Sequence, residues 1–205
     1  MDKRSREFTR DLRAFFADLA SRWDAQQPEN REAVLRNLLH PFAEQLRAAR
    51  AILDVGTGTG QLIPCLRVYA PTARLISIDL AHAMLSRAQQ RAQLCVPGAC
   101  LVQTDVHHLP FAAHRAAFDV VVCHNSFPHF AEIPLALREL RRILAPGGRL
   151  LILHDLSRER VNAIHSGAGG VIANDLLPFG EDLHAMLLAA GYSDVWVEDG
   201  ATQYR

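Results

Sequence analysis

The chain has 205 residues, of which 49% are hydrophobic, and its 22 basic and 22 acidic side chains give a formal net charge of zero. This length and apolar content predict one well-packed core and leave no room for two ordinary domains joined by a linker. The balanced charge argues against a surface that follows nucleic-acid phosphates, and no apolar run reaches the roughly twenty residues that a membrane span requires. We therefore expect a cytoplasmic protein with no nucleic-acid partner, while the composition gives no indication of its oligomeric state.

The first fifty residues are predicted to be helical. Apolar residues recur at helical spacing over residues 5–20, and a second helix is expected over residues 29–49. Because both helices precede the first strand, we expect residues 1–50 to form a cover, or lid, on a core that spans residues 51–205. Together the two parts make one domain.

From residue 51 onward, strands and helices alternate. Strands are predicted over residues 51–55, 74–78, 100–103, 118–123 and 149–154, and helices over residues 60–69, 83–94, 134–144 and 180–190. Strands separated by helices of this length imply right-handed βαβ units and a doubly wound, mostly parallel sheet with helices on both faces. A strand at 194–198 and a short antiparallel last strand complete the prediction of a seven-stranded, Rossmann-like α/β fold.

Acidic residues, glycines and a histidine follow four of these strands. The run 54–60 (DVGTGTG) follows the first strand, Asp79 ends the second, Asp105 follows the third, and His124 with Asn125 follows the fourth. In an open parallel sheet, ligands bind outside the carboxyl ends of the strands. All four stretches therefore point at one crevice.

The glycines of the first stretch predict a backbone that presses against a ligand. Gly56, Gly58 and Gly60 lack the Cβ atoms that would prevent a sharp turn and a close approach. Asp79, about twenty residues further along, can accept hydrogen bonds from both hydroxyls of a ribose. Both features also fit nicotinamide-dependent enzymes, so the glycine turn alone does not identify the cofactor.

Two further stretches separate these cofactors, namely residues 103–106 (QTDV) and residues 144–148 (LAPGG). With them, the sequence resembles the class I S-adenosylmethionine-dependent methyltransferases, particularly the small-molecule branch that includes the ubiquinone and menaquinone C-methyltransferases. The resemblance implies S-adenosylmethionine as cofactor, S-adenosylhomocysteine as product and a small-molecule acceptor.

The resemblance also assigns roles within the cofactor site. The glycine turn would pass beneath the methionine part, with Asp54 near its ammonium group. Asp79 would bind the ribose, and Asp105 would accept a hydrogen bond from the adenine amino group. The full set of implied cofactor-binding residues is Asp54, Gly56, Thr57, Gly58, Gly60, Asp79, Leu80, Asp105, Val106, His124 and Asn125. Capping of a helix or turn is the alternative role for Asp79 and Asp105.

Histidines supply the candidate catalytic groups. Transfer of a methyl group from a sulfonium is an in-line displacement, in which a base is optional. For a hydroxyl or an acidic carbon as acceptor, histidine has the pKa that suits proton removal near neutrality. The candidates are His124, His129, His154 and His165, whereas His107, His108 and His114 are expected to lie in a surface loop.

The predicted first helix offers aromatic side chains to such a site. Phe15, Phe16 and Trp23 can close over a sulfonium, because a positive charge is attracted to an aromatic face. Packing of an amphipathic helix explains the two phenylalanines equally well.

Three other functions are also compatible with the sequence. Three of the histidines can converge as an open metal site that serves a metal-bearing or metal-assisted substrate. A methyltransferase fold can also hold its cofactor without turnover, as a binding or regulatory protein. An NAD-dependent oxidoreductase is the third alternative, and Asp105 and the LAPGG turn argue against it.

Overall fold

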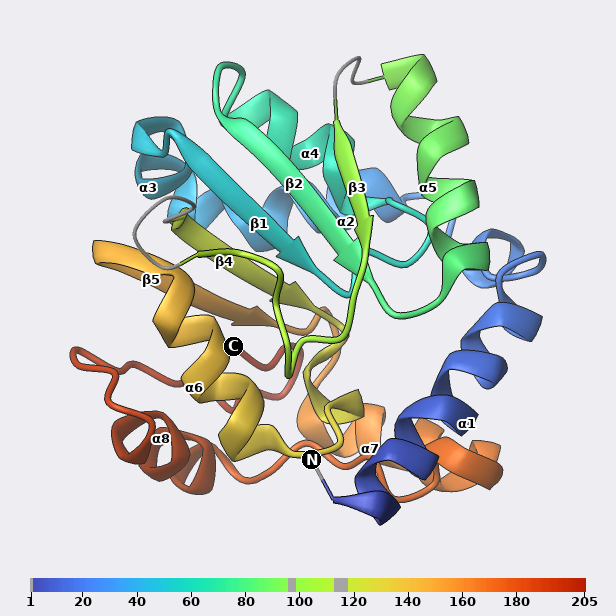
Figure 1. The fold of residues 1–205 in the computed structure, drawn as a ribbon. Helices are drawn as coiled ribbons and strands as arrows, with labels where there is room; N and C mark the ends of the chain where they lie inside the picture. Colours follow the sequence, from blue (N-terminus) through green and yellow to red (C-terminus); the bar gives the residue numbers. More distant parts are fainter. Residues whose placement is uncertain (1, 96–98, 113–117) are drawn as a thin grey trace.

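A parallel sheet of five strands, in the order β3-β2-β1-β4-β5, forms the centre of the structure (Figure 1). The computed structural model describes residues 2–95, 99–112 and 118–205. The strands are β1 (Ala51–Val55), β2 (Arg74–Asp79), β3 (Cys100–Gln103), β4 (Phe118–His124) and β5 (Leu144–Leu153). This sheet confirms the predicted doubly wound α/β architecture, with strand positions within a few residues of those expected except at the start of β5.

Helices cover both faces of the sheet, as the βαβ pattern predicts. They are α1 (Lys3–Leu19), α2 (Arg31–Leu39), α3 (Ala43–Ala48), α4 (Leu62–Tyr69), α5 (His82–Cys95), α6 (Ile133–Ile143), α7 (Arg158–Ala168) and α8 (Gly180–Ala189). Short 3-10 turns, η1 (Asp24–Gln26), η2 (His40–Phe42), η3 (Phe127–His129) and η4 (Gly170–Ile172), connect them. None of the described helices combines the length and the apolarity that crossing a membrane would require.

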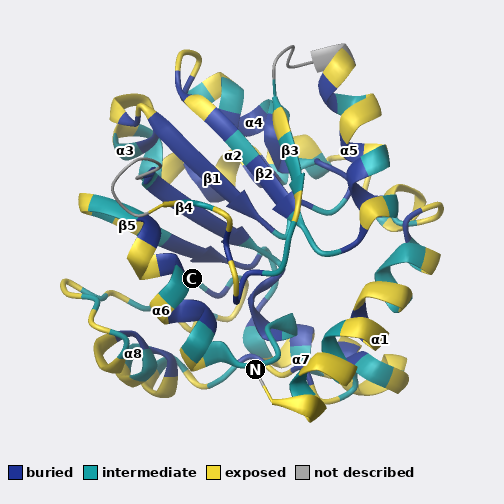
Figure 2. Ribbon diagram, viewed as in Figure 1, coloured by how far each residue is buried: buried dark blue, intermediate teal, exposed yellow. Residues whose placement is uncertain are grey.

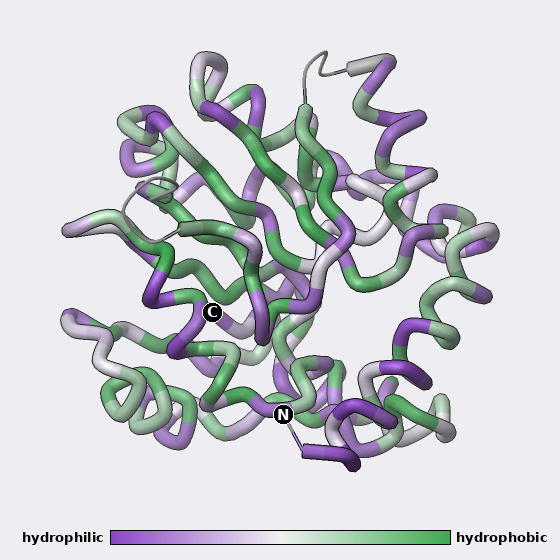
Figure 3. The backbone as a smooth tube through the Cα atoms, in the orientation of Figure 1, coloured by the Kyte–Doolittle hydropathy of each residue, from purple (hydrophilic) through white to green (hydrophobic). Residues whose placement is uncertain are grey.

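The core consists of two main layers of apolar side chains, one on each face of the sheet. Helices α6 and α8 contribute to one layer, and α2, α3 and α4 contribute to the other. All five residues of β1 are buried, with Leu53 facing the first layer and Ile52 the second. Figure 2 shows the central strands β1 and β4 as largely buried, and Figure 3 shows that they are also strongly hydrophobic. Burial on both faces explains why the central strands have continuous apolar sequences.

The N-terminal helices differ from the prediction in one respect. The helix expected over residues 29–49 is divided into α2 and α3 by the turn η2, which contains Pro41. Proline has no N–H to donate and its ring collides with the preceding helical turn, so it interrupts a helix. Helix α1 is confirmed, and the Asp2 carboxylate caps it by accepting a hydrogen bond from the Ser5 N–H at 2.8 Å.

The C-terminal region corrects the predicted strand count. The described residues contain five strands rather than seven, because residues 194–198 form no strand. Asp194 has a φ of 53°, which breaks the extended conformation that sheet pairing requires. The expected antiparallel last strand is reduced to isolated bridges, in which Tyr204 pairs with His154 and with Asp199.

The close contact between the glycine turn and α5 predicts a specific loss of stability. At Gly60, where φ is +79°, an added Cβ would lie 2.9 Å from the Ala88 Cβ and 3.0 Å from its Cα. We expect Gly60→Ala to lower the free energy of unfolding by about 2–4 kcal/mol, from crowding and left-handed strain. Urea denaturation measures this change.

Gly167→Ala is the matched control, because Gly167 lies in α7 with open space around it. Its unfolding free energy should stay within about 1 kcal/mol of the parent protein. Equal stability of the two variants would show that the turn does not depend on this contact.

Candidate active site

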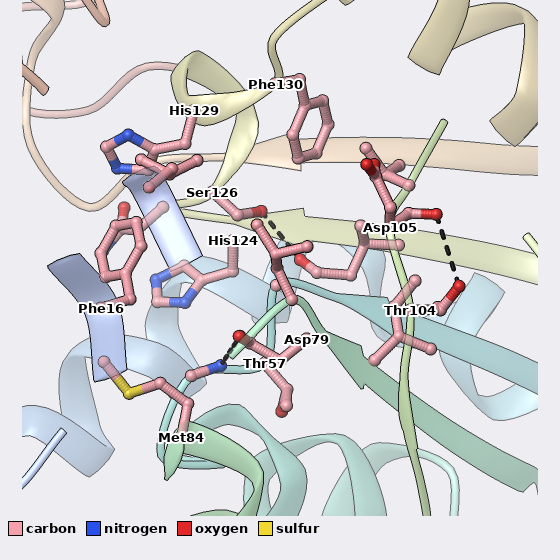
Figure 4. Close-up of a pocket in the computed structure, with 18 of the residues that line it drawn as sticks. Phe16, Thr57, Asp79, Met84, Thr104, Asp105, His124, Ser126, His129 and Phe130 are labelled. Carbon is pink, nitrogen blue, oxygen red and sulfur yellow. Dashed lines mark hydrogen bonds between the residues drawn. The ribbon is translucent and has the colours of Figure 1, made fainter. Parts of the chain in front are cut away.

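A cleft opens at the carboxyl ends of the parallel strands, where the sequence motifs converge (Figure 4). Its empty volume, including the part open to solvent, is about 1010 Å³. The turns after β1, β2, β3 and β4 form its walls, and α1 covers it with Thr9, Leu12 and Phe16. In Figure 4, His124, His129 and Phe16 lie on one side of the cleft and Asp105 on the other.

The three glycines of the turn after β1 have positive φ angles and three different surroundings. A Cβ on Gly56 would lie 2.4 Å from the Ser126 Cβ, so this glycine lets β1 and β4 end side by side. Gly60 packs on α5 and does not line the cleft. Gly58 has nothing within 4 Å of its virtual Cβ, so a side chain there would project into open space beside the cleft.

Asp79 joins the ends of β1 and β2. Its Oδ2 accepts a hydrogen bond from the Gly58 N–H at 2.8 Å, and its Oδ1 accepts one from the Ala81 N–H at 2.8 Å. The second bond closes the turn that precedes α5, so the turn-capping role considered from the sequence is present, and the residue also lines the cleft beside Leu80. Burial raises the pKa of Asp79, and the backbone N–H groups oppose that shift.

The turn after β3 brings Asp105 and Val106 to the opposite wall of the cleft. Although burial opposes ionisation, hydrogen bonds from His107 hold the pKa of Asp105 below its ordinary value. The prediction of a surface position is wrong for His107, which is 4% exposed, and correct for His108. His114 lies outside the described residues. A histidine two residues after an aspartate is the local pattern that could have indicated this contact.

Asp54 and Thr57 begin the turn but differ in access to the cleft. Thr57 lines the cleft, whereas Asp54 is 1% exposed and lies beneath the turn, outside the cleft lining. Burial raises the pKa of Asp54 to about 6, and its Oδ2 has no hydrogen-bond partner in the described part of the chain. A carboxyl group in this position is costly for folding when it is ionised.

A polar network links α2 to the ends of β4 and β5. The carboxylate of Asp155 accepts hydrogen bonds from Arg31 and from the Asn125 side chain, and its Oδ1 lies 3.6 Å from the His124 Nε2. Arg31 also donates through Nε to the Gln61 Oε1 at 2.9 Å. Despite burial, the histidine, the guanidinium and the amide hold the pKa of Asp155 well below its usual range. His124 and Asn125 are candidates from the sequence, whereas Arg31 and Asp155 belong to no local motif and are functional residues that the sequence alone does not reveal.

His129 lines the cleft and is paired with an aspartate from a distant segment. Its Nδ1 lies 2.7 Å from the Oδ2 of Asp175, which is 6% exposed. Its ring lies 5.0 Å from that of Phe16 and 4.8 Å from that of His165. Asp175 was not a sequence candidate, because it lies 46 residues from its partner.

The other two histidine candidates are buried behind the cleft rather than lining it. His165 donates through Nδ1 to the backbone carbonyl of Asp175, which fixes the segment that carries this aspartate. Asn162 reinforces it by exchanging two hydrogen bonds with the backbone of Leu177 at 2.8 and 3.1 Å. His154 is 1% exposed, and burial lowers its pKa to about 3, helped by the positive charge that the neighbouring histidines would carry.

A metal site receives no support from this arrangement. Within the described ranges, no three His, Cys, Asp or Glu side chains are placed so that they could hold a metal ion together. The candidate histidines instead contact aspartates, aromatic rings or the backbone.

Comparison with known proteins gives consistent matches. The family model described as "Methyltransferase domain" matches residues 53–152. The chain is 31% identical to the demethylmenaquinone methyltransferase of Thermus thermophilus, over 87% of this chain and 91% of that protein. It is also 31% identical to the malonyl-[acyl-carrier protein] O-methyltransferase of Geobacter sulfurreducens, over 93% of this chain and 73% of that protein. A solved S-adenosylmethionine-dependent methyltransferase from Aquifex aeolicus has the same fold, with a TM-score of 0.71, 21% identity and coverage of 90% and 95% of the two chains.

The buried carboxyl group of Asp54 predicts a pH-dependent stability difference. Its pKa is higher in the folded chain than in the unfolded chain, so its contribution to stability falls as the pH rises from about 4 to about 6. Asp54→Asn removes the ionisable group, and with it this loss of stability at higher pH. We expect the variant to gain up to about 3 kcal/mol relative to the parent protein between pH 4 and pH 8, measured by urea denaturation.

Asp119→Asn is the control, because its effect on the free energy of unfolding should be opposite in sign to that of Asp54→Asn. Asp119 accepts hydrogen bonds from the backbone N–H groups of Arg50 and Ala51, and its pKa is lowered although burial opposes this. The variant should be less stable than the parent protein at pH 8, with a smaller difference in acid. A pH-independent effect of Asp54→Asn would contradict the raised pKa.

Proposed function

This chain belongs to the class I S-adenosylmethionine-dependent methyltransferases, and we propose that its cleft holds the methyl donor against a small-molecule acceptor next to His129. The observation that carries this proposal is the convergence of the glycine turn, Asp79, Asp105 and His129 on one cleft. The family membership excludes the nicotinamide-dependent alternative for the glycine turn.

The geometry fits the methyl donor in its expected orientation. The backbone at Gly58 faces open space, where the methionine part would lie, and Arg31 and Gln61 provide polar groups at that end. Asp79 would accept hydrogen bonds from the ribose. At the other end, Leu80 and Val106 would pack on the adenine.

We also assign roles to the other residues that were expected at the donor site. Asp105 would accept a hydrogen bond from the adenine amino group. Gly56 and Thr57 line the same cleft, whereas Gly60 and Asp54 lie outside its lining and shape the turn from below. His124 and Asn125 would contact the donor close to its sulfonium.

The acceptor is proposed to lose its proton to His129. S-adenosylmethionine supplies an electrophilic methyl group and leaves as S-adenosylhomocysteine. His129 uses Nδ1 to donate to Asp175, which leaves Nε2 to accept a proton from an acceptor in the cleft. This pair suits an acceptor with a weakly acidic hydroxyl or carbon.

Residues 1–50 are proposed to act as a cover for the core at residues 51–205. Leu12 and Phe16 of α1 face the cleft, and Trp23 packs edge-on against Phe16 with 6.4 Å between ring centroids. Such a cover excludes water and surrounds a sulfonium with aromatic faces.

Binding of the donor tests the first half of the proposal. Asp79→Ala and Asp105→Ala each remove a hydrogen bond to a charged group, so we expect each to weaken S-adenosylmethionine binding by about 10–100-fold. Isothermal titration calorimetry measures the affinity, and circular dichroism checks the fold. Asp182→Ala, an exposed change on α8, should bind as the parent protein does. Unchanged affinity in both cleft variants would mean that the donor lies elsewhere.

Transfer to an acceptor tests the second half. The protein is incubated with methyl-labelled S-adenosylmethionine and a protein-free cell extract, and mass spectrometry detects labelled metabolites. His129→Asn keeps a donor for Asp175 but removes Nε2, so product formation should fall by about 10²–10⁴-fold while donor affinity is retained. Asp175→Asn should cause a smaller loss, because it removes only the charge.

His40→Ala is the control for this experiment, because His40 is exposed and lies outside the cleft lining. Full product formation by His129→Asn would contradict the proposed base. Donor binding with no labelled metabolite in the parent protein would instead favour a cofactor-binding protein without turnover.

A further inference from the structure

His107 is a buried histidine that bridges two elements of the cleft. Its side chain is 3% exposed and lies between the carboxylate of Asp105 and the backbone N–H of Glu132. Its Nδ1 lies 2.5 Å from the Asp105 Oδ1, and its Nε2 lies 3.1 Å from the Glu132 nitrogen. Glu132 is the N-cap residue of α6, so His107 connects the turn after β3 with the segment that follows β4.

The two contacts of His107 fix the position of its proton. A backbone N–H can only donate, so the Nε2 that faces Glu132 accepts and carries no proton. The proton of the neutral ring therefore resides on Nδ1, which donates to Asp105. The Asp105 Oδ1 also accepts from the backbone N–H of His107 at 3.0 Å.

These contacts leave the second carboxylate oxygen of Asp105, Oδ2, available to accept a hydrogen bond. Both donors from residue 107 go to Oδ1, and Oδ2 has no hydrogen-bond partner within residues 2–95, 99–112 and 118–205. A carboxylate with one oxygen held by two donors cannot rotate freely. Oδ2 is thus set as an acceptor in the wall of the cleft.

The turn itself does not depend on His107 for its position. Glu139 of α6 accepts a hydrogen bond from the Leu109 N–H at 2.9 Å, and Arg142 donates to the Phe111 carbonyl at 2.7 Å. These contacts hold the turn on α6 independently. Replacing His107 should therefore release the carboxylate without unfolding the turn.

We propose that His107 is a positioning residue, which orients the Asp105 carboxylate to accept a hydrogen bond from the 6-amino group of the donor's adenine. The inference rests on the proposed function, because it takes Asp105 as the adenine contact. It adds the prediction that selectivity for an amino purine depends on a residue that does not itself touch the base.

The test compares two ligands by calorimetry. One is S-adenosylhomocysteine, and the other is the same molecule with hydrogen in place of the adenine 6-amino group. The parent protein should prefer the first ligand by about tenfold or more, as expected for one hydrogen bond to a charged group. His107→Gln keeps an acceptor for the Glu132 N–H but loses the donor to Asp105, so this preference should fall toward one.

His107→Asn is the matched variant, because its side-chain amide can replace Nδ1 as donor to Asp105. It should restore most of the preference, although it loses the contact with Glu132. The positioning role would be overturned if His107→Gln weakened the binding of both ligands by the same factor, so that it kept the preference of the parent protein for the 6-amino ligand. Failure of the proposed function looks different, because the parent protein would then bind neither ligand, and the inference would fall with it.

Discussion

The hydrogen bond from the Gly58 N–H to the Asp79 carboxylate joins the first two strand ends, and the rest of the cleft is arranged around it. It exists because β1 and β2 are parallel neighbours in register, so that both end at the same edge of the sheet. The other oxygen of Asp79 accepts a hydrogen bond from the Ala81 N–H, just before α5 begins. Backbone groups therefore hold this carboxylate in place without any ligand. Such preorganisation lowers the entropic cost of binding.

Buried charge at the strand ends illustrates how function competes with stability. Asp155 is compensated by Arg31 and Asn125, and its ionised form is favoured. Asp54 has no comparable cation, and its raised pKa shows that the fold disfavours its charge. A carboxyl group that destabilises the folded chain is a sign of a functional constraint rather than of packing. Both aspartates lie near the end of the cleft that is proposed to hold the methionine part of the donor.

The proposed acceptor side of the cleft is built from segments that are distant in sequence. His129 follows β4, whereas its partner Asp175 lies beyond α7, and the backbone around Asp175 is held by His165 and Asn162. His154 stays neutral because burial and the neighbouring histidines oppose a positive charge. Of His129, His154 and His165, only His129 both lines the cleft and contacts a carboxylate. The division of roles follows from burial and not from residue type.

Local patterning was sufficient to predict the parallel sheet, most of the helices around it and the edge at which the motifs meet, because strand burial, glycine spacing and the acidic strand ends all depend on short stretches of sequence. It did not predict α7 or the break between α2 and α3. Asp79 and Asp105 were found for the same reason. The sequence could not show that residues 194–198 leave the sheet, that Asp54 lies below the cleft, or that His107 is buried against Asp105. Those outcomes depend on contacts between residues far apart in the chain. Only the packing of β4, α6 and the segment after α7 around one cleft decided which histidine meets which carboxylate.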